Sequence, residues 1–168
     1  MADTLHAFIT GQLLLKLRGD VADLRIRNGF DLCAAAYFHV RRLLLVQPGW
    51  SLLTEPGPRV GEADLTLSLK GQFRGLLRLD YLLRPGTSDW FPHEQLDARM
   101  AGLRDALRRH ESGGLGQAWL LGLFDSAGDW LFPGEEMYGK QSCFWLPVNC
   151  RTLPRHDEWR ARWEKLAA

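Results

Sequence analysis

The 168-residue chain is short of lysine, of cysteine and of net charge. Arginine outnumbers lysine 17 to 4, and the formal net charge is only +1. A charge this small excludes a strongly basic nucleic-acid binder, although it allows a local basic patch. The arginine excess has two explanations that the sequence leaves open. It fits bidentate contact with phosphate, and it fits the codon bias of a GC-rich genome.

The chain also lacks the signatures of secreted, membrane and common hydrolytic proteins. Its three cysteines form no CxxC pair and no signal peptide precedes them, so we expect reduced thiols and a cytoplasmic location. A disulfide between Cys143 and Cys150 across a hairpin is the alternative. No apolar run approaches the roughly 18 residues of a membrane span, so we expect no membrane segment. Neither GxSxG nor HExxH occurs, and no histidine stands at a metal-ligand spacing from a cysteine.

The spacing of apolar residues predicts one α/β domain over residues 1–168, with a mixed sheet of four to five strands flanked by helices. Residues 4–27 fit either a helix or two short strands about a turn at Gly19 and Asp20, and we favour a helix for the first part. The other expected helices and strands follow in chain order. They are a helix over 28–46, strands over 50–55, 64–69 and 76–83, a helix over 92–111, strands over 118–124 and 143–150, and a helix over 156–166.

Two of the expected strands each carry an aspartate among leucines. Asp64 opens the strand over 64–69, and Asp80 lies within the strand over 76–83. Aspartate is a poor strand former and its charge is costly to bury, so its presence here needs a reason. Arg78 shares the face of Asp80, because successive side chains of a strand alternate.

The element order and these acids resemble the PD-(D/E)XK (restriction-endonuclease-like) nuclease superfamily. Its core is a helix, a three-strand meander, a helix and a fourth strand. In that family an Asp begins the second strand, an acid-x-Lys triplet lies on the third, and the first helix often adds an acid. Asp64, Asp80 and Asp31 occupy these three acidic positions. The resemblance covers about 28–124, which leaves 125–168 as a C-terminal strand and helix extension.

The resemblance implies a site for DNA in which Asp64, Asp80 and Asp31 bind Mg²⁺ or Mn²⁺. Hard divalent ions prefer carboxylate oxygens, and they stabilise charge on the attacking water, the phosphoryl oxygens and the leaving group. The family supplies the expected setting as well, which is defence, repair or mobile-element biology.

The triplet lysine is missing, because Leu82 stands two residues after Asp80. Leucine cannot orient hydroxide or contact a phosphate. Arg78 could steady the phosphate, but only electrostatically, since a guanidinium stays protonated. Lys70 in the connecting loop could also reach over. The sequence therefore predicts a nuclease-like protein that binds or cleaves DNA with a degenerate metal site, and it leaves open whether the protein is an enzyme.

Simpler interpretations stand beside this one. Asp80 could form a structural ion pair with Arg78 or Arg104, and Asp31 could merely favour the start of a helix. Gln95 and Arg99, one turn apart, fit a solvated helix face. The whole chain could also be a non-enzymatic interaction or scaffold subunit of a larger complex. Its aromatic C-terminal third, with Trp159 and Trp163, would then bind a protein partner or a second copy.

Overall fold

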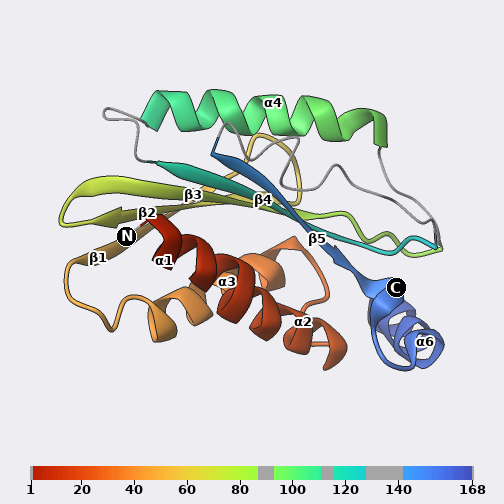
Figure 1. Cartoon of the computed structure of the whole chain (residues 1–168). Helices are drawn as coiled ribbons and strands as arrows, with labels where there is room; N and C mark the ends of the chain where they lie inside the picture. Colours follow the sequence, from red (N-terminus) through yellow and green to blue (C-terminus); the bar gives the residue numbers. More distant parts are fainter. Residues whose placement is uncertain (1, 87–92, 111–115, 128–141, 168) are drawn as a thin grey trace.

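A five-stranded mixed sheet runs through the middle of the molecule, with helices on both of its faces (Figure 1). The first three strands form an antiparallel meander, and the last two run parallel to the third. This arrangement confirms the expected α/β class and the mixed sheet flanked by helices. In spatial order the strands are β1 (Trp50–Pro56), β2 (Glu62–Leu69), β3 (Gln72–Tyr81), β4 (Gln117–Phe124) and β5 (Cys143–Asn149).

The structure, a computed structural model, describes residues 2–86, 93–110, 116–127 and 142–167, and of 2–3 and 93–95 the backbone alone. None of the helices within these ranges has the length and apolar character that crossing a membrane requires. The helices are α1 (Ala2–Ala7), the π-helical segment η1 (Phe8–Leu13), α2 (Leu14–Ala22), α3 (Gly29–Leu43), α4 (His93–His110), the 3₁₀ turn η3 (Cys150–Thr152) and α6 (His156–Ala167).

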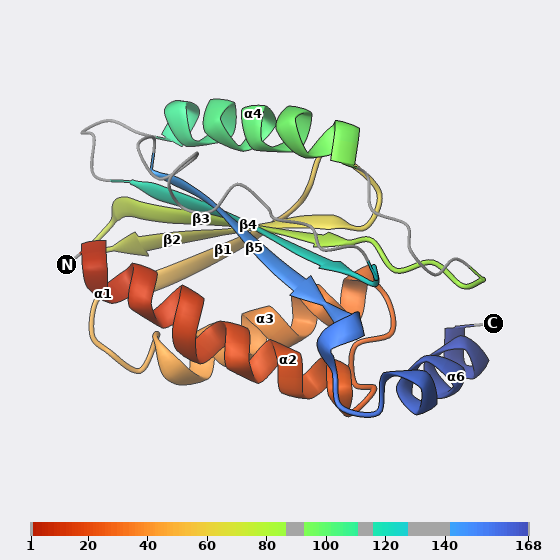
Figure 2. The same ribbon diagram turned by 45° about the vertical axis from the view of Figure 1, so that its right-hand side comes forward.

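The helices divide between the two faces of the sheet. Among the described helices, α4 lies on one face, against β3, β4 and β5, whereas α1, α2 and α3 cover the other (Figures 1 and 2). Strand β3 is buried on both sides, so its side chains divide between two cores. Leu77 and Leu79 belong to the large core under α1–α3, and Leu76 belongs to the smaller core under α4. Arg78 and Asp80 alternate with Leu77 and Leu79, so they share the face of Leu76 and point toward α4.

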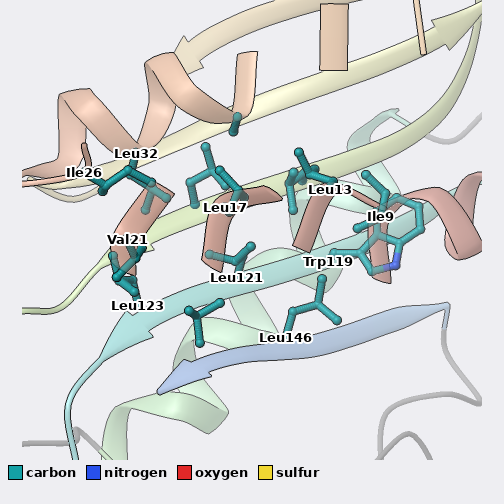
Figure 3. Close-up of a cluster of buried hydrophobic side chains, with 14 of the residues drawn as sticks. Ile9, Leu13, Leu17, Val21, Ile26, Leu32, Trp119, Leu121, Leu123 and Leu146 are labelled. Atoms are coloured by element: carbon teal, nitrogen blue, oxygen red, sulfur yellow. The ribbon is translucent and has the colours of Figure 1, made fainter. Parts of the chain in front are cut away.

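The N-terminal segment is helical throughout 2–22, which decides between the two expectations for 4–27. Apolar side chains recur at every fourth position and line up on one face, where they pack against β4 and β5 (Figure 3). Gly19, expected as a possible turn residue, lies inside α2, so the alternative of two short strands is wrong. The aligned residues are Leu5, Ile9, Leu13, Leu17 and Val21.

All three cysteines are free thiols, as expected. Cys143 begins β5 and Cys150 directly follows its end. An extended strand rises about 3.3 Å per residue, so the two sulfur atoms lie at opposite ends of one strand. The hairpin that a disulfide between them would need is absent from this described segment, and that alternative is wrong.

The tryptophans of α6 lie inside the fold. Trp159 is 4% exposed and Trp163 is 1% exposed, and their rings stack with centroids 6.1 Å apart. The Trp159 indole donates to the backbone oxygen of Val21 at 2.8 Å, and that of Trp163 donates to the Tyr81 hydroxyl at 3.1 Å. The two indoles thus fasten α6 to α2 and to the end of β3, and a partner could reach them only if α6 left its place.

Candidate functional site

Charged side chains from β2, β3 and α4 meet between the sheet and α4. The antiparallel register sets Glu62 opposite Asp80 and Asp64 opposite Arg78. Cross-strand partners hold their Cβ atoms about 5 Å apart, so these four groups converge. Arg99 of α4 completes the set, with its side chain 10% exposed. We call these five residues the charged layer.

Asp64 and Arg78 form a bidentate ion pair. Arg78 Nε donates to Asp64 Oδ1 at 2.8 Å, and Arg78 Nη2 donates to Asp64 Oδ2 at 2.9 Å. Their side chains are 15% and 7% exposed. The hydrogen bonds to Asp64 raise the pKa of Arg78 above its ordinary value, so the guanidinium is a fixed cation. Because two parallel hydrogen bonds occupy both carboxylate oxygens, Asp64 presents a neutralised group.

Arg99 is shared between two carboxylates. Its Nη1 donates to Glu62 Oε1 at 2.8 Å and also contacts Asp80 Oδ2. The side chains of Glu62 and Asp80 are only 2% and 3% exposed. One guanidinium nitrogen from α4 thus joins the two acids that face each other across β2 and β3. Asp80 does form a structural ion pair, but with Arg99 rather than with Arg78 or Arg104.

The electrostatic environment makes Asp80 hard to ionise. Burial raises the pKa of the Asp80 carboxyl to about 6, and the neighbouring Glu62 carboxylate acts in the same direction. Arg99 and Arg59 act the other way and only partly offset the burial. The carboxyl of Asp80 therefore takes up a proton, or requires a nearby cation, at a pH where an exposed aspartate is fully ionised.

Neither Arg78 nor Lys70 is placed to do what the missing triplet lysine would do, and Leu82 occupies its position. Leu82 is 8% exposed, and its backbone N–H donates to the oxygen of Leu123 at 2.9 Å. Lys70 lies in the turn that joins β2 to β3, whereas Glu62 and Asp80 lie at the other end of this strand pair. Arg78 faces the charged layer, where Asp64 binds it.

Asp31 is not brought together with the other acids. It lies in the first turn of α3, where its N–H donates to the Asn28 side chain at 2.9 Å and its carboxylate accepts from the Arg27 N–H at 2.9 Å. Helix α3 packs on the sheet face opposite α4 (Figure 2). The sheet therefore separates Asp31 from Asp64 and Asp80. Its contacts are those of a reciprocal N-terminal cap.

The charged layer holds fewer metal ligands than the resemblance implies. Within the described ranges, no group of three His, Cys, Asp or Glu side chains could hold a metal ion. Asp64 is taken by Arg78, which leaves Glu62 and Asp80 as the two acids that meet. A divalent ion between them would have to displace Arg99.

Glu62 was not singled out from the sequence, and the expectation that Arg99 lies on a solvated helix face is wrong, because its side chain is only 10% exposed; the side chain of Gln95 lies outside the described residues. The expected strand began at Asp64, whereas β2 begins at Glu62. Glu62 lies two residues before Asp64, so the two side chains share one face of the strand. Arg99 lies next to Met100 in the buried stripe of α4, but a charged helical residue ordinarily faces water. Only the tertiary structure shows that Arg99 points toward the sheet.

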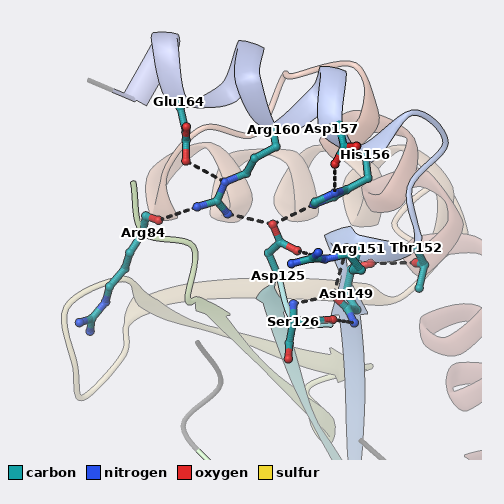
Figure 4. Close-up of polar contacts among 10 residues, drawn as sticks. All are labelled: Arg84, Asp125, Ser126, Asn149, Arg151, Thr152, His156, Asp157, Arg160 and Glu164. Carbon is teal, nitrogen blue, oxygen red and sulfur yellow. Dashed lines mark hydrogen bonds and ion pairs between the residues drawn. The ribbon is translucent and has the colours of Figure 1, made fainter. Parts of the chain in front are cut away.

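A second buried cluster lies where the parallel strands end (Figure 4). Asp125, one residue beyond β4, is 2% exposed at its side chain. Arg151 Nε donates to its Oδ1 at 3.1 Å, and Arg160 Nη1 donates to its Oδ2 at 2.9 Å. His156 Nε2 lies 2.9 Å from the same Oδ2. We call these four residues the Asp125 cluster.

The Asp125 cluster joins the end of β4 to two elements that follow much later in the chain. It ties the end of β4 to η3 and to two positions of α6. Arg160 also donates to Glu164 at 2.9 Å and to the backbone oxygen of Arg84 at 3.2 Å (Figure 4). These residues were not singled out from the sequence, because no local pattern connects Asp125 with η3 and α6.

A scan against protein-family models gives no match to the chain, and a search of curated protein sequences gives none either. The fold and the charged layer therefore carry the functional argument.

Proposed function

We propose that this protein is a catalytically silent relative of the PD-(D/E)XK nucleases that binds DNA without cleaving it. One observation carries the proposal. Both aspartates at the expected metal-binding positions are held by buried arginines, Asp64 by Arg78 and Asp80 by Arg99.

The architecture supports the relationship. Helix α3, the meander β1–β3, helix α4 and strand β4 follow in the order expected of that superfamily. Asp64 lies near the start of β2 and Asp80 near the end of β3, so antiparallel pairing brings both acids to the same end of the sheet. This placement is what an inherited two-acid site requires.

The cost of breaking these ion pairs argues against metal binding and catalysis at Asp64 and Asp80. A divalent ion at Asp64 or Asp80 would have to break a partly or fully buried ion pair, and losing one partner of such a pair costs about 2–5 kcal/mol. A displaced guanidinium would also remain beside the metal, where it repels the ion. Leu82 offers no group to orient an attacking water. Each requirement of metal-assisted hydrolysis thus meets an obstacle in these residues.

A cation at the edge of the charged layer is suited to phosphate. Arg59, in the connection between β1 and β2, is exposed and lies close enough to Asp80 to lower the pKa of that carboxyl. A DNA backbone approaching this end of the sheet would meet Arg59 first. Arginine binds phosphate through two parallel hydrogen bonds.

The test combines binding with cleavage. Fluorescence anisotropy of labelled duplex and single-stranded DNA, measured over a range of salt concentrations, should show binding that weakens with salt. Arg59→Ala should reduce the slope of log K against log salt by about 1. The matched control Arg155→Ala, whose side chain is 81% exposed on the α6 side, should leave the slope unchanged.

Two results would overturn the proposal. Cleavage of DNA by the wild type with Mg²⁺ or Mn²⁺, lost in Asp80→Asn, would show that the site is active. Absence of binding to both forms of DNA at low salt would remove the DNA-binding function.

A second candidate, an interaction subunit, is favoured by the outer ridge of α3. Phe30 is 88% exposed and Phe38 is 53% exposed, two turns apart on the side facing away from the core. Arg42 lies over the Phe38 ring at 6.0 Å. If the protein self-associates through this ridge, light scattering should give the mass of a dimer. Phe38→Ser should reduce the mass to that of a monomer, and Leu15→Ser on α2 should leave it unchanged. A monomeric wild type would exclude this form of the candidate.

A further inference from the structure

The contacts of Arg99 are those of a cation that bridges two acids. Its Nη1 alone contacts Glu62 Oε1, at 2.8 Å, and Asp80 Oδ2. The two carboxylates come from directly opposed residues of adjacent strands, so rigid backbone fixes the space between them. A metal ion held between two strands would take the same place.

We propose that Arg99 stands in for a divalent cation, and that Glu62 and Asp80, rather than Asp64 and Asp80, form the latent cation site of this fold. The inference rests on the proposed function, because it explains how a nuclease-like site became silent. In this view the fold keeps a positive charge between its two acids, and α4 supplies that charge.

An orphaned oxygen supports the assignment independently. Glu62 Oε2 is buried and has no hydrogen-bond partner among the residues that the structure describes, although the Glu62 side chain is only 2% exposed. A buried carboxylate oxygen is costly to leave unmatched. A guanidinium nitrogen serves one oxygen of Glu62, whereas a metal ion can be chelated by both oxygens of a glutamate.

The charge balance points the same way. Three carboxylates of the charged layer face two arginines within it, so its five groups carry an excess of one negative charge when all are ionised. Arg59, which also acts on Asp80, is an exposed side chain outside the layer. Asp64 does not account for this excess, because Arg78 neutralises it through two hydrogen bonds. The excess lies on Glu62 and Asp80. Oxygen ligands suit a hard cation such as Mn²⁺ or Mg²⁺, with water completing the coordination shell.

The experiment removes the built-in cation. Calorimetric titration of Mn²⁺ into Arg99→Met should give binding with a Kd below roughly 1 mM, on the order of tenfold or more tighter than for the wild type. Arg108→Met, at an exposed position of the same helix, is the matched control and should behave as the wild type.

Double variants identify the ligands. Adding Glu62→Gln or Asp80→Asn to Arg99→Met should weaken Mn²⁺ binding by about tenfold or more, whereas adding Asp64→Asn should change it by less than about threefold. Binding that survives Glu62→Gln but is lost with Asp64→Asn would overturn the assignment. A folded Arg99→Met that binds no Mn²⁺ would overturn it as well.

The test remains decisive if Arg99→Met folds poorly. Mn²⁺ should then raise its melting temperature by about 3–6 °C at roughly ten times the Kd, or restore folding, since the ion would replace the missing charge. Arg99→Lys, which keeps a cation, should show neither effect. An Arg99→Met chain that Mn²⁺ does not stabilise contradicts the inference.

The outcomes separate the inference from the proposed function. DNA cleavage by the wild type would refute the proposed lack of nuclease activity. It would not bear on whether Glu62 and Asp80 are ligands, which the Arg99→Met titrations decide. Failure of those titrations leaves a silent DNA-binding protein whose acids are purely structural.

Discussion

The charged layer and the Asp125 cluster are both buried ion-pair networks, but their charge balances are opposite. The charged layer places three carboxylates against two guanidinium groups and leaves Glu62 Oε2 without a hydrogen-bond partner among the described residues. In the Asp125 cluster, one carboxylate is surrounded by Arg151, Arg160 and His156. Counting only the residues that define each network, the charged layer has three carboxylates to two guanidinium groups, and the Asp125 cluster has one carboxylate to two, of which Arg160 also binds the half-exposed Glu164.

The difference bears on the roles that we propose for the two networks, a latent cation site for the charged layer and a structural role for the Asp125 cluster. A structural network is expected to satisfy each buried charge, because one that is left unmatched costs more than the pair contributes. The Asp125 cluster meets that expectation and connects β4, η3 and α6. The charged layer does not meet it. An unmatched acid in a buried network is consistent with the latent cation site proposed above.

The largest loss of stability is expected in the Asp125 cluster. Asp125→Ala leaves Arg151, Arg160 and His156 close together without their shared anion, so the free energy of unfolding should fall by about 3–5 kcal/mol. Urea denaturation measures this loss. Asp157→Ala is the control: that carboxylate lies 3.5 Å from His156 but is fully exposed, and its loss should be close to neutral. Equal losses in the free energy of unfolding for the two variants would contradict a buried structural role of the Asp125 cluster.

A smaller loss is expected when one arginine is removed from the charged layer. Arg78→Met leaves Asp64 partly buried and unpaired, which should lower the free energy of unfolding by about 2–3 kcal/mol. Adding Asp64→Asn should recover part of this loss, because the amide carries no charge. If the double variant is as unstable as the sum of the two single variants, the bidentate pair contributes no coupling and the charged layer is not a network.

The stability of the charged layer should depend on pH through Asp80. The pKa of Asp80 is raised to about 6 in the folded chain, above the value near 4 of an unfolded aspartate. Between these values the folded chain holds a proton that the unfolded chain has released, so the free energy of unfolding falls as pH rises. From about pH 4 to about pH 7, the wild type should lose about 1–2 kcal/mol relative to Asp80→Asn. Parallel pH profiles would contradict the shift.

The smallest effect is expected at Asp31, outside both networks. Asp31→Ala removes one half of the cap of α3 and should cost about 0.5–1 kcal/mol. Because the sheet separates it from Asp80, Asp31→Ala should not alter Mn²⁺ binding by Arg99→Met. Asn28→Ala, which removes the other half of the cap, should have a similar cost. A change in Mn²⁺ affinity would place Asp31 in the site after all.

Much of the fold could be read from the sequence because the apolar pattern is regular. The alternation of Leu65 and Leu67 in β2 indicates which face is buried, whereas the N-terminal segment fitted both a helix and two short strands. The start of β2 was placed two residues late, because Glu62 and Ala63 carry no strand signal of their own. The burial of Trp159 and Trp163 was not foreseen, since a short amphipathic helix does not reveal which surface it covers.

The candidate site could be predicted only in part. The alternation of strand residues was sufficient to place Arg78 and Asp80 on one face, and pairing of β2 with β3 brought Asp64 close to them. The partner of each acid could not be predicted, because it depends on how α4 lies across the sheet. Arg99 and Asp80 are 19 residues apart in the chain, and no local pattern connects them.

The most direct test of this account is a calorimetric titration of Mn²⁺ into the wild-type protein. With Arg78 on Asp64 and Arg99 between Glu62 and Asp80, we expect no binding up to roughly 1 mM Mn²⁺. Binding with a Kd well below that concentration, lost in Asp64→Asn, would contradict the account and identify Asp64 as a metal ligand of a functional site.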